Sequence, residues 1–195
     1  MQNFWKNIWD SKGLSDNNDL LYLCGWEHLN VNVNSESIVK QIIKQTNTKS
    51  THKILEVGCG AGLLSREFQD YDYTGVDYSK PLIDKHKILF PEHNVRVAEA
   101  NKLPFDDNQF DTVFCSGVFQ YLSNLDYAIS TIDEMTRVAK HSVMVVDLKT
   151  IATNNNHLVV PQHIFEKKGF KFSECMYCED ETRYNAYKEI KNDLE

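Results

Sequence analysis

A glycine-rich segment with the spacing of a ligand-binding loop follows the apolar run at residues 53–57. The end of that run and the segment together read Leu55-Glu56-Val57-Gly58-Cys59-Gly60-Ala61-Gly62. Glycines let the backbone approach a ligand closely and adopt conformations that other residues resist. The spacing is G-x-G-x-G, whereas the fingerprint of dinucleotide-binding proteins is G-x-G-x-x-G and needs a glycine where Leu63 stands. The segment predicts a ligand-binding bend, and its spacing argues weakly against a dinucleotide.

Two carboxylates are expected at the same edge of the protein as this bend. Asp77 ends a second strand-like run, residues 73–77, and Glu99 lies just past a third, residues 95–98. In an open parallel sheet, ligands bind beyond the carboxyl ends of the strands, and an acidic residue there accepts ribose hydroxyls. Glu99 is placed to accept an adenine amino group. The three features predict a ligand that contains adenosine, and an ordinary strand-end aspartate is the alternative for Asp77.

A further segment completes a set of motifs. After the third strand the chain reads Glu99-Ala100, then Leu103-Pro104-Phe105 and Phe110-Asp111. Together with the bend and Asp77, this run resembles the class I S-adenosylmethionine-dependent methyltransferases of the small-molecule type. The resemblance spans about residues 50 to 175, and the combination of motifs is more specific than any one of them. The family usually has Asp where Glu99 stands and Lys-Pro-Gly-Gly where this chain has residues 139–142.

The resemblance implies that the cofactor is S-adenosyl-L-methionine and that the product is S-adenosyl-L-homocysteine. It implies that Glu56, Gly58 and Gly60 hold the methionine part, that Asp77 binds ribose, and that residues 78, 99 and 100 lie beside the adenine. The full set of residues expected to bind the cofactor is Glu56, Gly58, Cys59, Gly60, Gly62, Asp77, Tyr78, Ser79, Glu99, Ala100, Ser116 and Gly117.

Methyl transfer from a sulfonium needs alignment of the acceptor and exclusion of water, and a hydroxyl acceptor also profits from a general base. The candidates for a catalytic group are Tyr121 and His157. An unperturbed Tyr titrates near 10, so Tyr121 and its neighbour Gln120 are better suited to orienting the substrate. The predicted activity is methylation of oxygen or nitrogen on a small molecule.

The N-terminal part of the chain is rich in aromatic residues. We expect an irregular segment over residues 1–34, followed by a helix over 36–45 that Ser35 caps. The segment is predicted to close over the acceptor and exclude water, and simple packing on the core is the alternative. The residues expected to bind the substrate are Trp5, Trp9, Tyr22, Trp26, Gln120 and Tyr121.

Strands and helices are expected to alternate along most of the chain. This alternation predicts an α/β fold: a Rossmann-like, doubly wound, seven-stranded sheet, mostly parallel with one antiparallel strand, and helices on both faces. We expect a single methyltransferase domain over residues 1–195, with the cap and first helix at 1–48 and the core at 49–195. Strands are expected at 53–57, 73–77, 95–98, 111–116, 142–148, 170–178 and 183–190, and helices at 63–69, after Ser79, at 125–140 and at 161–168.

Charge and composition limit the kinds of partner that the chain is expected to bind. The chain has 21 Lys and Arg against 28 Asp and Glu, a net charge of −7, which disfavours a nucleic-acid partner. No apolar run has the length of a membrane span, and no signal peptide is recognisable. The five cysteines are interpreted as reduced thiols, and no metal site is expected because Cys175 and Cys178 lack a second pair of ligands. We expect a cytoplasmic monomer or homodimer that binds neither nucleic acid nor membrane.

Two other functions remain open at this point. One is an NAD(P)-dependent oxidoreductase on a similar sheet, which the glycine spacing argues against. The other is a non-catalytic protein that binds S-adenosylmethionine, because binding and transfer are separable and the candidate bases are weak.

Overall fold

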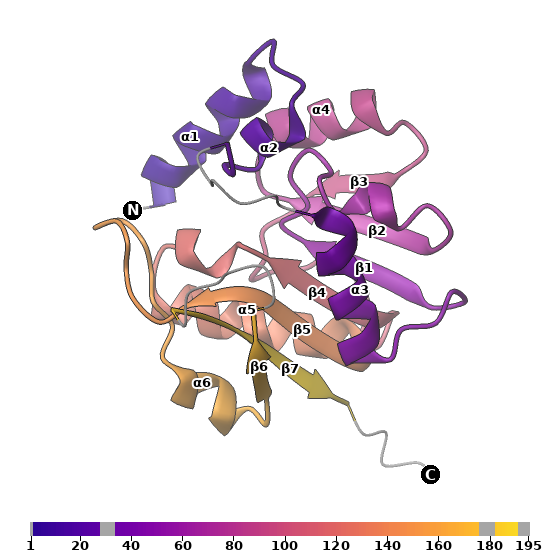
Figure 1. Cartoon of the computed structure of the whole chain (residues 1–195), viewed down its shortest axis with the longest axis vertical. Coiled ribbons are helices and arrows are strands. Elements are labelled where there is room, and N and C mark those ends of the chain that lie inside the picture. The colour runs from indigo at the N-terminus through magenta and orange to yellow at the C-terminus, as the bar shows by residue number, and fades with distance from the viewer. Residues whose placement is uncertain (1, 28–33, 176–181, 191–195) are drawn as a thin grey trace.

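One seven-stranded sheet forms the centre of the protein (Figure 1). The computed structural model describes residues 2–27, 34–175 and 182–190. The strand order is β3-β2-β1-β4-β5-β7-β6, and β7 is antiparallel to both of its neighbours while the other pairs are parallel. The predicted fold class is therefore confirmed. The strands are β1 (Lys53–Val57), β2 (Asp72–Asp77), β3 (Asn94–Val97), β4 (Phe110–Ser116), β5 (Ala139–Lys149), β6 (Lys171–Glu174) and β7 (Arg183–Glu189).

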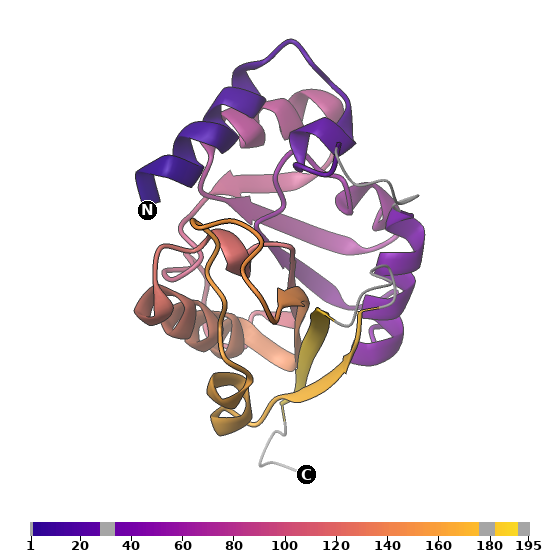
Figure 2. The same cartoon turned by 60° about the vertical axis from the view of Figure 1, so that its left-hand side comes forward.

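Helices cover both faces of the sheet (Figures 1 and 2). Alternate residues of each central strand point to opposite faces, so β1 sends Ile54 towards α3 and Leu55 towards α5. The α3 face is apolar at Ile38 and Ile42, and the α5 face at Ile132. The helices are α1 (Gln2–Leu14), α2 (Leu20–Leu23), α3 (Ser35–Thr46), α4 (Lys80–Leu89), α5 (Leu125–Val138) and α6 (Gln162–Lys167), with 3-10 turns η1 (Ser65–Glu67) and η2 (Phe119–Tyr121).

The expectation of an irregular segment over residues 1–34 is wrong for its described part. Residues 2–14 form α1, whose Trp5 and Trp9 share one face at i, i+4 spacing, and residues 20–23 form α2. α1 lies along α4, as both views show (Figures 1 and 2). Gly13 makes this approach feasible, because a Cβ atom there would lie 2.6 Å from the Leu82 nitrogen.

The cap of α3 also differs from the prediction. Asn34, not Ser35, is the N-cap residue, and its side chain accepts a hydrogen bond of 3.2 Å from the Ser37 N–H. The Ser35 hydroxyl instead donates to Glu67 Oε1 at 2.6 Å. Ser35 therefore ties α3 to η1, beside the glycine-rich bend.

Three further boundaries differ from the expected ones. The helix predicted over 63–69 is only the short η1, because the Ser65 hydroxyl binds the Gly62 carbonyl oxygen at 3.1 Å and competes with helical bonding. The helix expected over 125–140 ends at Val138, and the strand expected from residue 142 already begins at Ala139, which is fully buried and pairs with Phe110. The strand expected over 170–178 ends at Glu174 as β6, and residues 176–181 lie outside the described part.

No helix within the described residues is long and apolar enough to cross a membrane. The helical elements serve to cover the sheet and to close one end of it. That end carries the carboxyl termini of the parallel strands β1, β2 and β4, where ligands bind in folds of this type.

Candidate functional site

The glycine-rich segment forms a tight bend after β1. Gly58, Gly60 and Gly62 all have positive φ, at 80°, 50° and 101°. A Cβ atom on Gly58 would lie 2.4 Å from Val118 Cγ2, whereas one on Gly60 would meet nothing within 4 Å. Gly58 is therefore required by packing, and Gly60 leaves open space beside the backbone for a ligand.

Asp77 is bonded to this bend. Its Oδ2 accepts a hydrogen bond of 3.0 Å from the Gly60 N–H, and its Oδ1 accepts one of 2.8 Å from the Ser79 N–H. Burial raises the pKa of Asp77 to about 6, and the two amide hydrogen bonds partly oppose that rise. The end of β2 and the bend thus share one buried carboxylate.

Glu56 is a second buried carboxyl group beside the bend. Its Oε2 accepts a hydrogen bond of 2.7 Å from the Tyr73 hydroxyl. Burial raises the pKa of Glu56 to about 8, against the lowering effect of the Tyr73 hydrogen bond, and the charge of Asp77 adds to the rise. Glu56 is therefore largely protonated at neutral pH when no cation lies near it.

Glu99 lies on the same rim as Asp77. The Ala98 N–H donates a hydrogen bond of 3.0 Å to the Asp77 carbonyl oxygen, so the end of β3 is held against the end of β2. The Tyr127 hydroxyl donates to Glu99 Oε2 at 2.6 Å. Tyr78 lies between these acidic residues in the sequence, and Lys6 Nζ is 5.6 Å from the centre of its ring.

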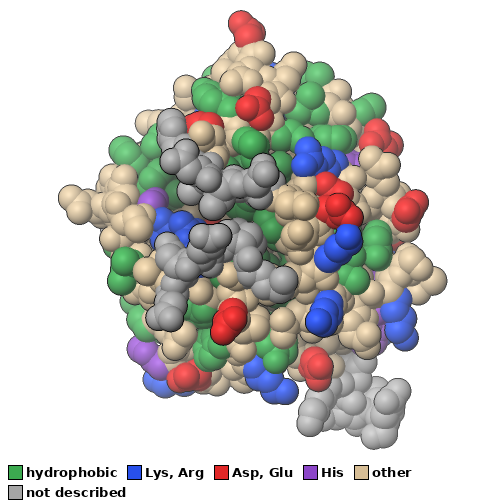
Figure 3. Space-filling view, in the orientation of Figure 1, with side chains coloured by type: hydrophobic (Ala, Val, Ile, Leu, Met, Phe, Trp, Pro, Cys, Tyr) green, Lys and Arg blue, Asp and Glu red, His purple; other side chains and the backbone are tan. Residues whose placement is uncertain are grey.

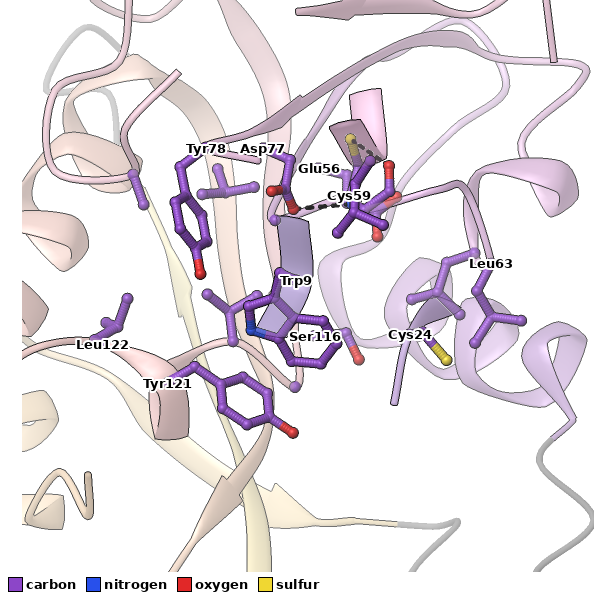
Figure 4. Close-up of a pocket in the computed structure, with 18 of the residues that line it drawn as sticks. Trp9, Cys24, Glu56, Cys59, Leu63, Asp77, Tyr78, Ser116, Tyr121 and Leu122 are labelled. Carbon is purple, nitrogen blue, oxygen red and sulfur yellow. Dashed lines mark hydrogen bonds between the residues drawn. The ribbon is translucent and has the colours of Figure 1, made fainter. Parts of the chain in front are cut away.

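These groups line one pocket, which is open to solvent and mostly apolar, as clefts that bind small molecules usually are. Figure 4 shows Asp77 and Tyr78 on one side of the pocket and Trp9 and Tyr121 below them. Figure 3 shows hydrophobic side chains near the middle of the face in view. The predicted residues that line the pocket are Trp9, Trp26, Glu56, Gly58, Cys59, Gly60, Asp77, Tyr78, Glu99, Ala100, Ser116, Gly117 and Tyr121.

Other predicted residues lie just behind this lining. The Gly62 N–H donates to the Cys59 carbonyl oxygen at 3.1 Å and so closes the bend. The buried Ser79 caps α4, and its hydroxyl donates to Asp10 Oδ1 at 2.6 Å. Gln120 is buried, and its Nε2 donates to the Gly117 carbonyl oxygen at 3.3 Å. These three residues support the lining from outside.

Trp5 and Tyr22 are also outside the lining. The Trp5 indole N–H donates to the Asn156 carbonyl oxygen at 2.9 Å, which fastens α1 to the loop after β5. The Lys12 ammonium lies 4.1 Å from the centre of the Tyr22 ring. Both residues hold α1 in place, next to the aromatic side chains that do reach the pocket.

The two predicted catalytic residues have different positions. Tyr121 lines the pocket, its ring centre 5.0 Å from that of Trp9, and burial raises its pKa to about 12. His157 lies behind it, stacked on Trp5 at 5.2 Å and edge-on to Tyr121 at 5.5 Å. Burial, then the charges of Lys149 and Arg183, lower the pKa of His157 to about 4. At neutral pH Tyr121 therefore keeps its proton, and His157 is neutral but only a weak base.

Several residues of the site carry no signal in the sequence. Cys24, Leu82 and Tyr127 line the pocket, because α2 ends and α4 and α5 begin at its rim. The fully buried His86 lies behind the bend, with its Nδ1 3.0 Å from the Gly60 carbonyl oxygen. Their roles depend on how helices pack, which spacing along the chain does not reveal.

The fold and pocket together define an α/β protein of Rossmann-like architecture with a site for a nucleoside-containing ligand. Residues 55–146 match the family described as "Methyltransferase domain". The segment 55–146 therefore belongs to this methyltransferase family, as the motifs predict.

Curated relatives agree with this membership. The chain is 28% identical over 150 residues to the ubiquinone/menaquinone biosynthesis C-methyltransferase UbiE of Desulfotalea psychrophila, a match that covers 73% of this chain and 59% of the relative. It is 32% identical over 119 residues to the demethylmenaquinone methyltransferase of Staphylococcus saprophyticus, over 57% of this chain and 50% of the relative. The matched region therefore spans only about half to three fifths of these relatives.

Solved structures agree on the fold. Magnesium protoporphyrin IX methyltransferase from Synechocystis, crystallised with bound SAM, superimposes with a TM-score of 0.70 at 13% identity and 97% coverage of both chains. Phosphoethanolamine N-methyltransferase 1 of Haemonchus contortus gives a TM-score of 0.71 at 14% identity, over 96% of this chain and 48% of that chain. At such identities the likeness concerns architecture alone.

The family membership also bears on the oxidoreductase alternative. A Tyr-x-x-x-Lys spacing, as in short-chain dehydrogenases, occurs at Tyr184 and Lys188. Both residues lie in β7, and neither is among the residues that line the pocket. The family and the glycine spacing both favour a methyltransferase.

Proposed function

We propose that the chain binds S-adenosyl-L-methionine in this pocket and transfers its methyl group to a small-molecule acceptor, on oxygen or nitrogen. The observation that carries the proposal is that the open bend at Gly60 and the carboxylates of Asp77 and Glu99 face a single pocket. An aromatic wall of Trp9, Trp26 and Tyr121 adjoins it. Residues 1–195 act as one domain, with 1–48 as cap and first helix and 49–195 as core.

Some of the predicted cofactor residues contact the cofactor, and others hold the contacting residues in position. Asp77 binds the ribose, Glu99 and Ala100 bind the adenine, and Tyr78 packs beside it. The methionine part lies along Gly58 and Gly60, with its ammonium near Glu56. Ser116 and Gly117 line the wall next to the methyl group, while Cys59, Gly62 and Ser79 keep the bend and Asp77 in position.

Bound S-adenosylmethionine supplies an electrophilic methyl group on sulfur. Tyr121, Trp9 and Trp26 exclude water and orient the acceptor, which is the main requirement for this reaction. Trp5, Tyr22 and Gln120 hold those side chains in place. His157 acts as a positioning residue for Tyr121, because its ring contacts Tyr121 and Trp5 and is not among the residues that line the pocket.

A carbon acceptor is the second candidate. It is favoured by the relative from Desulfotalea psychrophila, whose name describes a C-methyltransferase. Methylation of a carbon gives a product that differs from an ether or amine in its methyl chemical shift. Isotope-labelled methyl groups and NMR of the product distinguish the three acceptor atoms.

Calorimetry with S-adenosylmethionine and NAD, compared side by side, tests cofactor binding. We expect saturable binding of the first and none of the second, and the reverse result would reject the proposal. Formation of S-adenosylhomocysteine with a panel of phenols, amines and thiols then tests catalysis. Cofactor binding with no turnover on any acceptor would favour a non-catalytic binding protein.

The Tyr121→Phe and His157→Gln variants test the acceptor side. With Tyr121→Phe, we expect kcat/KM for the acceptor to fall by about tenfold, the typical worth of one hydrogen bond to a bound ligand, while S-adenosylmethionine affinity is unchanged. With His157→Gln we expect a smaller loss and an unchanged pH profile. A pH profile that flattens in His157→Gln would instead identify His157 as the base.

We also propose a cytoplasmic monomer or homodimer that binds neither nucleic acid nor membrane. The net charge of −7 supports the first exclusion. The free thiols at Cys24, Cys59 and Cys115 fit a reducing compartment. Light scattering after size-exclusion chromatography measures the oligomeric state, and an electrophoretic shift with duplex DNA would contradict the exclusion of nucleic acid.

A further inference from the structure

Asp147 occupies an unusual position at the carboxyl end of β5. Three non-glycine residues of the described part have positive φ, and two of them, Asn47 and Asn108, are asparagines outside the strands. Asp147 is the third, at φ 67°, and it lies inside a strand with 3% of its surface exposed. Such a conformation is strained for a non-glycine residue and is enriched at functional sites.

Neighbouring strands hold this conformation in place. The register between β5 and β7 shifts between Val145 and Leu148, which marks a bulge that re-aims the Asp147 side chain. The Asp147 N–H donates to Asn185 Oδ1 at 3.1 Å, and Asn185 is fully buried in β7. The strain at Asp147 is therefore built into the packing of two strands.

The Asp147 carboxylate lies between an arginine and the pocket wall. Arg183 Nη1 donates to Asp147 Oδ1, and this pair is largely buried. The other oxygen, Oδ2, is 3.6 Å from the place where a Cβ atom of Gly117 would stand, and Trp26 Cζ2 is 3.8 Å from the same place. Gly117 and Trp26 both line the pocket. The absent side chain of Gly117 thus leaves a gap between the pocket and Asp147, which itself lies behind the residues that line the pocket.

The side chains nearest this gap are flat and aromatic. Trp9 and Tyr121 meet edge to face at 5.0 Å, and Trp26 lines the same pocket. Ser116 lines the same pocket, and its Oγ is buried with no hydrogen-bond partner among the described residues. Aromatic side chains of this kind favour an aromatic or conjugated ligand, and an unpartnered hydroxyl in the same lining favours a polar group on that ligand.

We propose that Asp147, held by Arg183, accepts a hydrogen bond from a hydroxyl or amino group of the methyl acceptor through the gap at Gly117. The acceptor is then a planar aromatic or conjugated molecule with a hydrogen-bond donor besides the atom that receives the methyl group. This inference rests on the proposed function, because it assigns the substrate class of the same pocket. Asp147 is a specificity-determining residue, and the proposal gives it no role in proton transfer.

Ligand-observed NMR tests the proposal on protein saturated with S-adenosylhomocysteine. The probes are catechol and 2-aminophenol, which carry a second donor, and 1,2-dimethoxybenzene, which carries none. We expect the first two to bind wild-type protein at least about tenfold more tightly than the third, because a hydrogen bond to a charged group contributes that much or more. The Asp147→Asn variant should abolish this preference.

The variant is chosen to preserve the fold. Asn tolerates the left-handed conformation and has nearly the same shape as Asp, so affinity for S-adenosylhomocysteine is expected to stay unchanged. Asp107→Asn is the matched control, because Asp107 forms an exposed pair with Arg137 at 2.7 Å and does not line the pocket. That control should retain the wild-type preference.

Two results would overturn the inference. One is equal affinity of wild-type protein for all three probes, or no binding of either donor probe, which needs no variant to observe. The other is an unchanged preference in Asp147→Asn. Failure of S-adenosylhomocysteine itself to bind would instead reject the proposed function, so the two failures are distinguishable.

Discussion

The Gly60 N–H donates a hydrogen bond of 3.0 Å to Asp77 Oδ2, which makes the bend after β1 and the end of β2 one hydrogen-bonded unit. Asp77 therefore has two tasks: it presents a carboxylate to the pocket, and it satisfies buried backbone amides. The same unit extends to α1, because Ser79 donates to both Asp77, through its N–H, and Asp10, through its hydroxyl.

Replacing Asp77 by alanine should affect both tasks. We expect affinity for S-adenosylmethionine to fall by about 10- to 100-fold, because hydrogen bonds to a charged group are lost. The amides of Gly60 and Ser79 also lose their partner, so the free energy of unfolding should fall by about 1–3 kcal/mol. Calorimetry and urea unfolding measure the two effects. Unchanged affinity would count heavily against the cofactor assignment.

Gly58 and Gly60 should respond differently to alanine. In Gly58→Ala the new methyl group meets Val118 at 2.4 Å, so we expect a loss of stability of about 1–3 kcal/mol. In Gly60→Ala the methyl group enters open space at a φ of 50°, so the fold should lose only about 1 kcal/mol.

The cofactor assignment predicts the opposite order for binding. Gly60→Ala places its methyl group where the cofactor would lie, so affinity should fall by more than about tenfold, as for a bound ligand that loses one good contact. Thermal unfolding with and without S-adenosylhomocysteine compares the two variants. Full ligand stabilisation of Gly60→Ala would place the ligand elsewhere.

Glu56 should make the free protein less stable at higher pH. Its folded pKa of about 8 lies above the ordinary value of 4.5, so folding favours the protonated form. Its stabilising contribution is complete below about pH 4.5 and is lost as the pH rises through about 8. The Glu56→Gln variant mimics the neutral acid, so wild type should lose stability relative to it over this range.

Urea unfolding of cofactor-free protein at about pH 5, 7 and 9 measures this difference. Glu166→Gln serves as the control, because Glu166 is exposed on α6 and should show no such trend. A difference between wild type and Glu56→Gln that does not change with pH would mean that Glu56 is already ionised in the folded protein.

The packing of α1 on α4 predicts a kinetic effect. In Gly13→Val the side chain would collide with Pro81 and Leu82, so α1 should lift from α4 while the sheet stays folded. We expect faster dissociation of S-adenosylmethionine, because Trp9 belongs to α1 and lines the pocket. Stopped-flow tryptophan fluorescence measures the rate. Ser11→Val, on an exposed position of the same helix, should leave it unchanged.

The sequence predicts the fold where local patterns and global packing agree. The apolar runs of β1, β4 and β5 suffice to predict the centre of the sheet, because buried parallel strands need continuous apolar sequence. α1 was missed because its few aromatic residues lie among polar ones. The helix expected after the bend was wrong because Ser65 bonds to Gly62.

The residues of the site can likewise be separated into those that the sequence predicts and those that it does not. The bend, Asp77 and Glu99 follow directly from strand ends, so their meeting at one pocket was predictable. Tyr127 and His86 were not, because their roles depend on α5 and α4 packing beside the bend. Asp147 was visible only as a residue at the end of a strand, since its strain arises from the bulge against β7.

The position of β7 has a consequence for synthesis of the chain. β7 follows every other strand in the sequence, yet it lies between β5 and β6 in the sheet. A ribosome releases residues in order, so the part of the cofactor site from β1 to Glu99 emerges well before Arg183 does. Until then β5 has an unpaired edge, and unpaired edges invite association with other chains. The nascent chain would therefore complete this part of the cofactor site first. It would most need a chaperone just before β7, the last described strand, leaves the ribosome.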